Sequence, residues 1–175
     1  LKERRPLVVV PRETPLNLRL LGDRNYAIGL LLVTIYGMLN FTPMVLLPPL
    51  LQQHVGFPDE QVGVVIGSRG AGMMVGFLAA GLMRRVDPRV GMIVGFLLQI
   101  GSGLWMLGFD LNVTQQILVA NSLIQGFAVG IIWVPLSVVA FETLDPSHRA
   151  EAASVFHLLR NIGSSFFISV SVAEI

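Results

Sequence analysis

The sequence predicts an all-α fold, a multi-pass bundle of transmembrane helices. Three observations lead to this fold class. Hydrophobic residues make up 53% of the 175 residues and charged residues only 13%, about half the share that is usual in a soluble domain. The mean hydropathy is +0.71. The apolar residues gather in five runs separated by short polar segments, and each run has the roughly 20 residues that a helix needs to cross a bilayer.

Composition also limits what the chain can do. It contains no cysteine, which excludes disulfide bonds, zinc–thiolate sites and thiol chemistry. A net charge of +1 argues against nucleic acid as a partner. No metal-ligand cluster, phosphate-binding loop or nucleophile–base pair stands out, so we expect no metal and no cofactor. Leu1 is not an initiator methionine, and we interpret the chain as a fragment of a longer membrane protein.

The first segment, residues 1–24, is polar and holds six of the twelve Lys and Arg residues. We expect it to be a connector on the cytoplasmic side. Thr14-Pro15 can start a short leucine-rich helix over residues 16–21, which is typical of a segment lying at the membrane surface. A solvated connector fits these residues equally well.

The first span is expected at about 26–51. Prolines lie in its second half, at positions 43, 48 and 49. Because proline lacks the backbone N–H that a helix needs, we expect the helix to kink or end there.

The second span is expected at about 62–83, after a loop at 52–61. Pro58, Asp59 and Glu60 predict its start, because acidic side chains in a first turn complement the helix dipole. Its glycines are spread over two faces, so we expect helices to pack on two sides of it. These glycines are Gly63, Gly67, Gly70, Gly72, Gly76 and Gly81.

A short loop leads to a third span, expected at about 90–109. Asp87-Pro88 has the chemistry of a helix start, an acceptor side chain at the N-cap followed by proline at the first helical position. The third span is the least polar, with only Gln99 and Ser102 inside it. We therefore expect it at the lipid-facing rim of the bundle.

Two further spans are expected at about 117–141 and 151–172. Asp145-Pro146 repeats the helix-start chemistry before the last one. At 100° per residue, the polar side chains of the fifth span fall within roughly one 100° arc, and this polar stripe should face protein or water. The stripe comprises His157, Arg160, Asn161, Ser164 and Ser171.

Basic residues orient the bundle. Segments 1–24, 84–89 and 142–149 hold ten of the twelve Lys and Arg residues. The two opposite loops hold none, and the remaining two arginines, Arg69 and Arg160, lie inside spans. Since positively charged loops stay on the cytoplasmic side, we expect these three segments there, in a multi-pass protein of the plasma membrane.

Several stretches together carry a resemblance to a known family. They are Asp23-Arg24-Asn25-Tyr26, Leu47 to Gln52, Ser68 to Gly72, Gly81 to Arg89, Gln125 to Gly130 with Val134-Pro135-Leu136, and Ala152-Ala153-Ser154 with Arg160 to Ser165. In this order they resemble the major facilitator superfamily, in its branch of fourteen-span EmrB/QacA-type drug:proton antiporters. The resemblance covers nearly the whole chain and implies five helices of a C-terminal lobe, equivalent to spans nine to thirteen.

The resemblance implies that the chain is part of a membrane transporter. The leading hypothesis is proton-coupled export of drugs or other amphiphilic molecules by alternating access. A transporter of an endogenous metabolite and a non-transporting structural membrane module stay open as alternatives. The implied partners are the lipid bilayer, a small-molecule substrate, protons and the N-terminal lobe of the same protein. A membrane enzyme is the weaker rival, because the ionisable groups inside the spans are only Arg69, His157 and Arg160.

The loop from Gly81 to Arg89 is similar to the loop that follows a second helix in this family. It departs from the pattern Gly-x-x-x-Asp-Arg-x-Gly-Arg-Arg, because Asp87-Pro88 stands where Gly-Arg is expected. The departure weakens a gating role. The residues of interest in this loop are Gly81, Arg84, Arg85, Asp87 and Arg89.

Arg69 and Arg160 are the sharpest candidates for a functional site. An arginine near the bilayer centre costs about 2.5–3.5 kcal/mol on insertion scales, so each must face protein or water. Each could contact substrate or the other lobe, or could serve structure by bonding to helix carbonyls or a neighbour. His157 could relay protons or simply pack, and aromatic faces can bind organic cations. The candidate pathway residues are Tyr36, Asn40, Arg69, Gln125, Trp133, His157, Arg160 and Asn161.

Overall fold

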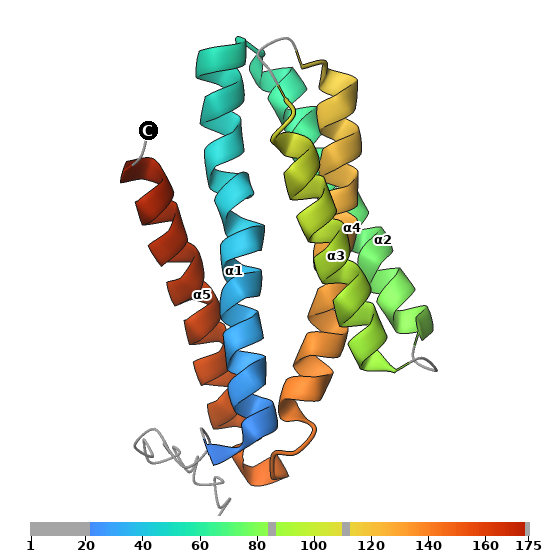
Figure 1. The fold of residues 1–175 in the computed structure, drawn as a ribbon, viewed down its shortest axis with the longest axis vertical. Helices are drawn as coiled ribbons and strands as arrows, with labels where there is room; N and C mark the ends of the chain where they lie inside the picture. Colours follow the sequence, from blue (N-terminus) through green and yellow to red (C-terminus); the bar gives the residue numbers. More distant parts are fainter. Residues whose placement is uncertain (1–21, 84–86, 110–112, 174–175) are drawn as a thin grey trace, which may run out of the picture.

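The computed structural model describes residues 22–83, 87–109 and 113–173. Over these ranges the helices follow in the order α1 (Arg24–Leu50), a π-helical turn η2 (Leu51–Val55), α2 (Asp59–Leu82), α3 (Pro88–Met106), α4 (Gln115–Phe141), a 3₁₀ turn η4 (Pro146–His148) and α5 (Arg149–Ala173) (Figure 1). All five α-helices are long and apolar enough to cross a membrane. The prediction of an all-α, multi-pass bundle is confirmed. Most of the expected connector lies outside the described residues.

Aspartate side chains cap three of the helical starts. Asp23 accepts hydrogen bonds from the backbone N–H groups of Asn25 (2.9 Å) and Tyr26 (3.1 Å) at the start of α1. Asp87 accepts from the Arg89 N–H at 2.9 Å and so caps α3, as Asp87-Pro88 predicts. Asp145 accepts from the Ser147 N–H at 2.9 Å and starts η4, which leads directly into α5.

Asp23 also joins the start of α1 to the turn after α4. A hydrogen bond from the Thr143 side chain, together with the one from the Tyr26 N–H, holds the pKa of the Asp23 carboxyl below its usual value. Asn25 donates to the Val139 carbonyl at 3.3 Å. The first turn of α1 is thereby fixed against the last turns of α4.

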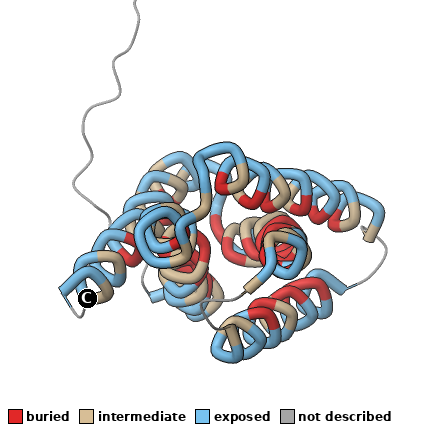
Figure 2. The backbone as a smooth tube through the Cα atoms, turned by 90° about the horizontal axis from the view of Figure 1, so that it is seen from above, coloured by how far each residue is buried: buried red, intermediate tan, exposed pale blue. Residues whose placement is uncertain are grey.

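Helix α4 is the central helix of the bundle. It packs against α2, α3 and α1, while α5 packs along α1 (Figure 1). Viewed from above, the buried residues lie on the sides of the helices that face one another, and exposed residues surround them (Figure 2). The largest core cluster is built around α1, α4 and α5, and includes Tyr26, Val33, Leu136 and Phe156.

The contact between α2 and α4 is made backbone to backbone. A Cβ atom placed on Gly76 would lie 2.9 Å from the Cα atom of Gly130, and the reverse substitution meets the same distance. A Cβ atom on Gly72 or Gly126 would likewise collide with a backbone carbonyl of the opposite helix. Small residues at these positions allow a close helix crossing.

Among the described helices, α4 makes the extensive contact with the second span. A Cβ on Gly63, Gly67 or Gly70 would meet no atom within 4 Å, because α4 covers only the face that carries Gly72 and Gly76. The second packing side expected for this span therefore stays a prediction.

The α-helix of the first span continues past Pro43 and Pro48 and ends at Leu50, one residue after Pro49. Helix α1 runs through Pro43, Pro48 and Pro49 to Leu50 and then continues as η2. A π-helical turn has a wider hydrogen-bond spacing, and here it follows the two adjacent prolines directly. The expected loop at 52–61 is accordingly reduced to 56–58, and α2 begins at Asp59.

Pro43 has a different consequence. Because proline has no N–H, it cannot bond to the Leu39 carbonyl one turn earlier. That carbonyl instead accepts a hydrogen bond from the Gln99 side chain of α3 at 3.4 Å. The two polar residues expected inside the third span, Gln99 and Ser102, are both buried. The opposite face of α3 exposes Ile93, Leu97, Ile100 and Leu104, which fits the expected place at the rim.

Candidate functional site

A cavity of about 520 Å³ lies near the middle of the helices, between α1, α2, α4 and α5. We call it the central cavity. Of the eight candidate residues, five line it: Tyr36, Asn40, Arg69, Trp133 and Arg160. The rest of its lining comes from Phe41, Met44, Ile66, Gly70, Met73 and Phe77. Sequence reasoning missed these residues, because an apolar side chain facing a cavity is indistinguishable from one facing lipid.

Arg69 is buried, with 8% of its surface exposed, and uncharged groups surround its guanidinium. Its Nη1 donates to Oε1 of Gln125 at 2.5 Å. Its Nη2 donates to the backbone carbonyl of Asn40 at 2.9 Å and to the Asn40 side-chain oxygen at 3.2 Å. Two amide side chains and one carbonyl therefore hold the charge in place without a carboxylate.

The position of Arg69 is set by its surroundings on α4. A Cβ on Gly126 would collide with the backbone carbonyl of Arg69, so the glycine allows the two helices to touch at this residue. The adjacent Gln125 then reaches the guanidinium, and its own amide nitrogen donates to the Met106 sulfur at 3.1 Å. The sequence predicted Gln125 as a candidate, and the structure makes it a direct partner of Arg69.

Aromatic rings form the opposite part of the central cavity. The centroid of the Trp133 ring lies 5.3 Å from that of Tyr36 and 5.9 Å from that of His157. The guanidinium carbon of Arg160 lies 5.2 Å from the Trp133 centroid and 5.7 Å from that of Phe41. Both distances fall within the range of cation–π contacts.

Hydrogen bonds to Arg160 are weaker than those to Arg69. Its Nη2 is 3.5 Å from Oδ1 of Asn161, which is the long limit for such a bond. Its Nε is buried with no hydrogen-bond partner. His157 and Asn161 are exposed. All eight candidate residues thus line the central cavity or contact residues that line it. Arg69 is held by hydrogen bonds, whereas Arg160 lies against aromatic rings.

Two glycines that the sequence analysis did not single out bring Arg160 to this place. A Cβ on Gly37 of α1 would collide with the backbone carbonyl of Arg160. A Cβ on Gly163 of α5 would lie 2.7 Å from the Thr34 carbonyl oxygen. The close crossing of α1 and α5 depends on both positions. The sequence shows a glycine in each helix but does not show that the two helices cross at these positions.

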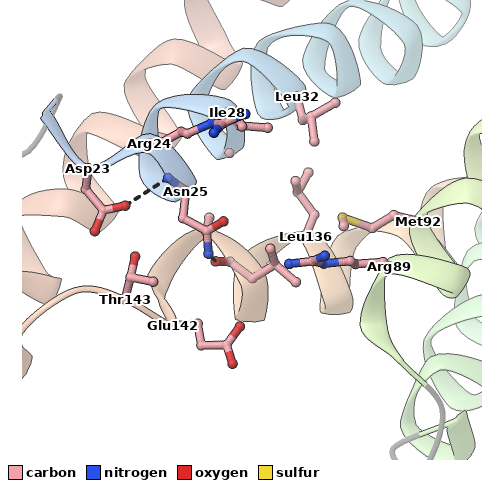
Figure 3. Close-up of a pocket in the computed structure, with 13 residues that line it drawn as sticks. Asp23, Arg24, Asn25, Ile28, Leu32, Arg89, Met92, Leu136, Glu142 and Thr143 are labelled. Carbon is pink, nitrogen blue, oxygen red and sulfur yellow. Dashed lines mark hydrogen bonds between the residues drawn. The ribbon is translucent and has the colours of Figure 1, made fainter.

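The described residues of the predicted loop, Gly81, Asp87 and Arg89, do not line the central cavity. Asp87 caps α3 and Gly81 is exposed, while Arg84 and Arg85 are outside the described residues. Arg89 lines a second cavity, of about 940 Å³, at the ends of α1, α3 and α4. Figure 3 shows the Arg89 side chain extending toward Leu136, with polar residues from the start of α1 and the end of α4 around it. Figure 3 also shows the Asp23 cap at its edge.

Metal ligands do not gather in the part of the chain that the structure describes. No group of three or more His, Asp or Glu residues there could hold a metal ion. The lining of the central cavity carries two arginines and, among its described residues, no Asp or Glu. The cavity is therefore positively charged, aromatic and partly apolar.

Comparison with known proteins agrees with this architecture. The family model described as the Major Facilitator Superfamily matches residues 9–173. The chain is 28% identical to the multidrug export protein EmrB of Escherichia coli over 163 residues, which are 89% of this chain and 31% of that protein. It is 32% identical to the multidrug resistance protein B homolog of Mycobacterium tuberculosis over 160 residues, 87% of this chain and 29% of that protein.

A third relative is the fatty acid resistance protein FarB of Neisseria gonorrhoeae, 23% identical over 157 residues, 88% of this chain and 31% of that protein. The chain spans less than a third of the length of each of these relatives. The family match includes every described helix of the bundle. The chain therefore belongs to the Major Facilitator Superfamily.

Proposed function

We propose that this chain is part of a transporter that exports amphiphilic small molecules, drugs among them, across the plasma membrane. The observation that carries the proposal is the central cavity. Residues from four helices of a Major Facilitator Superfamily chain line it, and it combines apolar side chains, aromatic rings and two arginines. Small-molecule sites are typically concave and mostly apolar, with a few polar groups that fix orientation.

An amphiphile suits both parts of this lining. Its apolar body would contact Met44, Ile66, Met73 and Phe77, and its polar group would lie toward Arg69 and Arg160. The names of the relatives point to the same chemistry, since two of them refer to multidrug export or resistance and one to fatty acid resistance. A fatty acid is itself an amphiphile.

The position of the cavity suits alternating access. In this mechanism one helical repeat rocks against another around a site at their interface, near the middle of the membrane. The polar side chains His157 and Asn161 of α5 are exposed beside the cavity. We infer that this part of α5 faces an N-terminal lobe or the aqueous pathway, because placing polar side chains in the hydrocarbon core of the membrane costs free energy.

Proton coupling is the finer part of the proposal and rests on the resemblance to drug:proton antiporters. Within the described helices, Asp and Glu lie only near the helix ends, for example Asp59, Glu60 and Glu151. We infer that a membrane-embedded acid carrying the proton would come from another part of the complete protein.

Uptake into everted membrane vesicles tests the function. Vesicles containing the complete protein, with an acidic lumen, should take up amphiphilic drugs or a long-chain fatty acid with saturable kinetics. Uptake should stop when a protonophore collapses the gradient. Saturable uptake of none of these compounds would contradict export of amphiphiles, and uptake that persists without the gradient would contradict proton coupling alone. Uptake restricted to a polar metabolite would favour the alternative of an endogenous substrate.

A further inference from the structure

Arg160 occupies the position that an organic cation would take in an aromatic cage. The cage consists of the Phe41 and Trp133 rings, with the guanidinium carbon 5.7 Å and 5.2 Å from their centroids. The Tyr36 ring packs against Trp133 and supports it. Aromatic cages of this kind bind quaternary ammonium and similar organic cations. In this chain the cage is filled by a cation that belongs to the protein.

The charge of Arg160 is not neutralised by its surroundings. The described lining of the central cavity contains a second arginine but no carboxylate. The guanidinium has one hydrogen bond, at the long limit of 3.5 Å, and its Nε is buried without a partner. Arg69, by contrast, has three hydrogen bonds of 2.5–3.2 Å. The hydrogen-bonding capacity of Arg160 is therefore largely unused in the structure.

The backbone of Arg160 is held more firmly than its side chain. The carbonyl of Arg160 contacts Gly37 of α1, and Gly163 of the same helix contacts the backbone of Thr34. These contacts hold the backbone of Arg160 against α1, beside the cavity that its side chain lines.

We propose that Arg160 determines the charge selectivity of the central cavity. Its guanidinium excludes organic cations from the cage by occupying it and by repulsion, and it pairs with the anionic group of an amphiphilic substrate that enters. This proposal rests on the proposed transport function and specifies the substrate charge at the same site. Removal of the positive charge should open the cage to organic cations.

Two ions of nearly identical shape and opposite charge make the test sharp. Tetraphenylphosphonium is a permanent cation and tetraphenylborate is the matching anion, so the ratio of their affinities reports charge selectivity and cancels apolar contributions. Equilibrium binding of both ions to the purified complete protein in detergent is measured without any transport step. The wild-type protein should bind the anion more tightly.

Arg160→Gln should raise the affinity for tetraphenylphosphonium about tenfold and lower that for tetraphenylborate about tenfold, each equivalent to ~1.4 kcal/mol. Arg160→Lys should retain most of the wild-type ratio because it keeps the charge. Arg160→Met serves as a second neutral variant if the glutamine does not fold. Adding Trp133→Leu to the neutral variant should abolish the gained cation binding, since the cage then lacks its largest ring.

Arg149→Gln is the matched control, because Arg149 lies at the start of the same helix, outside the central cavity, and donates to the Leu144 carbonyl. It should leave the ratio unchanged. An unchanged ratio in folded Arg160→Gln or Arg160→Met protein would overturn the proposal, as would an equal change in Arg149→Gln. These experiments measure binding without transport. A failure of the charge-selectivity proposal would therefore not contradict the transport function, which the vesicle assay tests separately.

Discussion

Arg69 and Arg160 show how far residue type alone can predict a role. Both are lone arginines in apolar runs, and the sequence gives each the same two readings, substrate contact or structural bond. In the structure Arg69 makes three hydrogen bonds to uncharged groups, whereas Arg160 lies against aromatic rings. The difference depends on residues from other helices, so no local pattern could have predicted it.

Loss of the Arg69 partners should be costly and non-additive. Arg69→Leu leaves the Gln125 oxygen unpaired, and Gln125→Leu leaves a guanidinium nitrogen unpaired. An unsatisfied buried polar group costs about 1–3 kcal/mol, more when it is charged, so each single variant should clearly lower the melting temperature of the complete protein. The double variant should be less destabilised than the sum of the two, because no unpaired group remains at this bond.

Thermal unfolding followed by size-exclusion chromatography in detergent would measure this cycle. Arg24→Leu, at the exposed start of α1, is the control and should change the melting temperature little. Strict additivity of the two core variants would show that Arg69 and Gln125 do not interact in the folded protein.

Transport should depend on Arg160. We expect Arg160→Ala in the complete protein to leave membrane insertion intact but to lower the initial rate of amphiphile uptake in everted vesicles at least about tenfold, since the substrate loses its ionic partner. Arg160→Lys should restore transport only in part, because lysine keeps the charge but lacks the planar guanidinium. Val155→Ala on the same helix should have little effect. Normal transport by Arg160→Ala, normalised to protein abundance, would make the arginine structural.

Candidate residues could be found from sequence only where they break an apolar pattern. Asn40, Gln125 and Trp133 stand out in this way, and the structure brings them to one cavity or its immediate border. Phe41 and Met73 do not stand out, because lipid and cavity select the same apolar side chains. Gly37 escaped notice because its role is to leave room for another helix.

At the scale of the helices, the sequence predicted where helices begin better than it predicted which helices pack against one another. Asp87-Pro88 and Asp145-Pro146 act through bonds within a few residues, and the structure contains those bonds. The continuation of α1 through Pro43 and Pro48 was not predicted, and the second packing side of α2 stays a prediction. The course of α1 depends on residues of other helices, such as the Gln99 side chain, which donates to the Leu39 carbonyl freed by Pro43.

The crossing of α2 and α4 should tolerate no added methyl group. Gly76→Ala would place a Cβ 2.9 Å from the Cα of Gly130, so the two backbones would have to separate. Such overpacking costs typically about 1–3 kcal/mol. The yield of monodisperse protein and its melting temperature in detergent should both fall.

Gly67→Ala is the matched control on the same helix, because its Cβ would meet nothing within 4 Å. Alanine is the better helix former by about 1 kcal/mol, so this variant should be as stable as the wild type or more stable. Equal effects of the two substitutions would show that the close crossing is absent from the folded protein.

At the scale of the whole molecule, the distribution of basic residues predicts the orientation in the membrane. The chain has no cysteine, so single introduced cysteines can be labelled in a complete protein whose other cysteines, if present, have been replaced. Cysteine in place of Glu60, in the first turn of α2, should react with an impermeant thiol reagent in intact cells. Cysteine in place of Ser147, between α4 and α5, should react only after permeabilisation.

Both positions are exposed in the structure, so a difference in labelling would report membrane sidedness and not burial. Labelling of Ser147→Cys in intact cells without labelling of Glu60→Cys would reverse the proposed orientation.

The glycine contact between α2 and α4 also restricts how this sequence can diverge. At Gly72, Gly76, Gly126 and Gly130, the space for a side chain is already taken by the main chain of the opposite helix, so no compensating change in another side chain could make room. Homologues that keep this crossing should retain glycine at all four positions together, while the position of Gly67 should vary freely. Loss of glycine at one of the four should therefore coincide with loss at the others, which makes them a single inherited unit and not four independent sites.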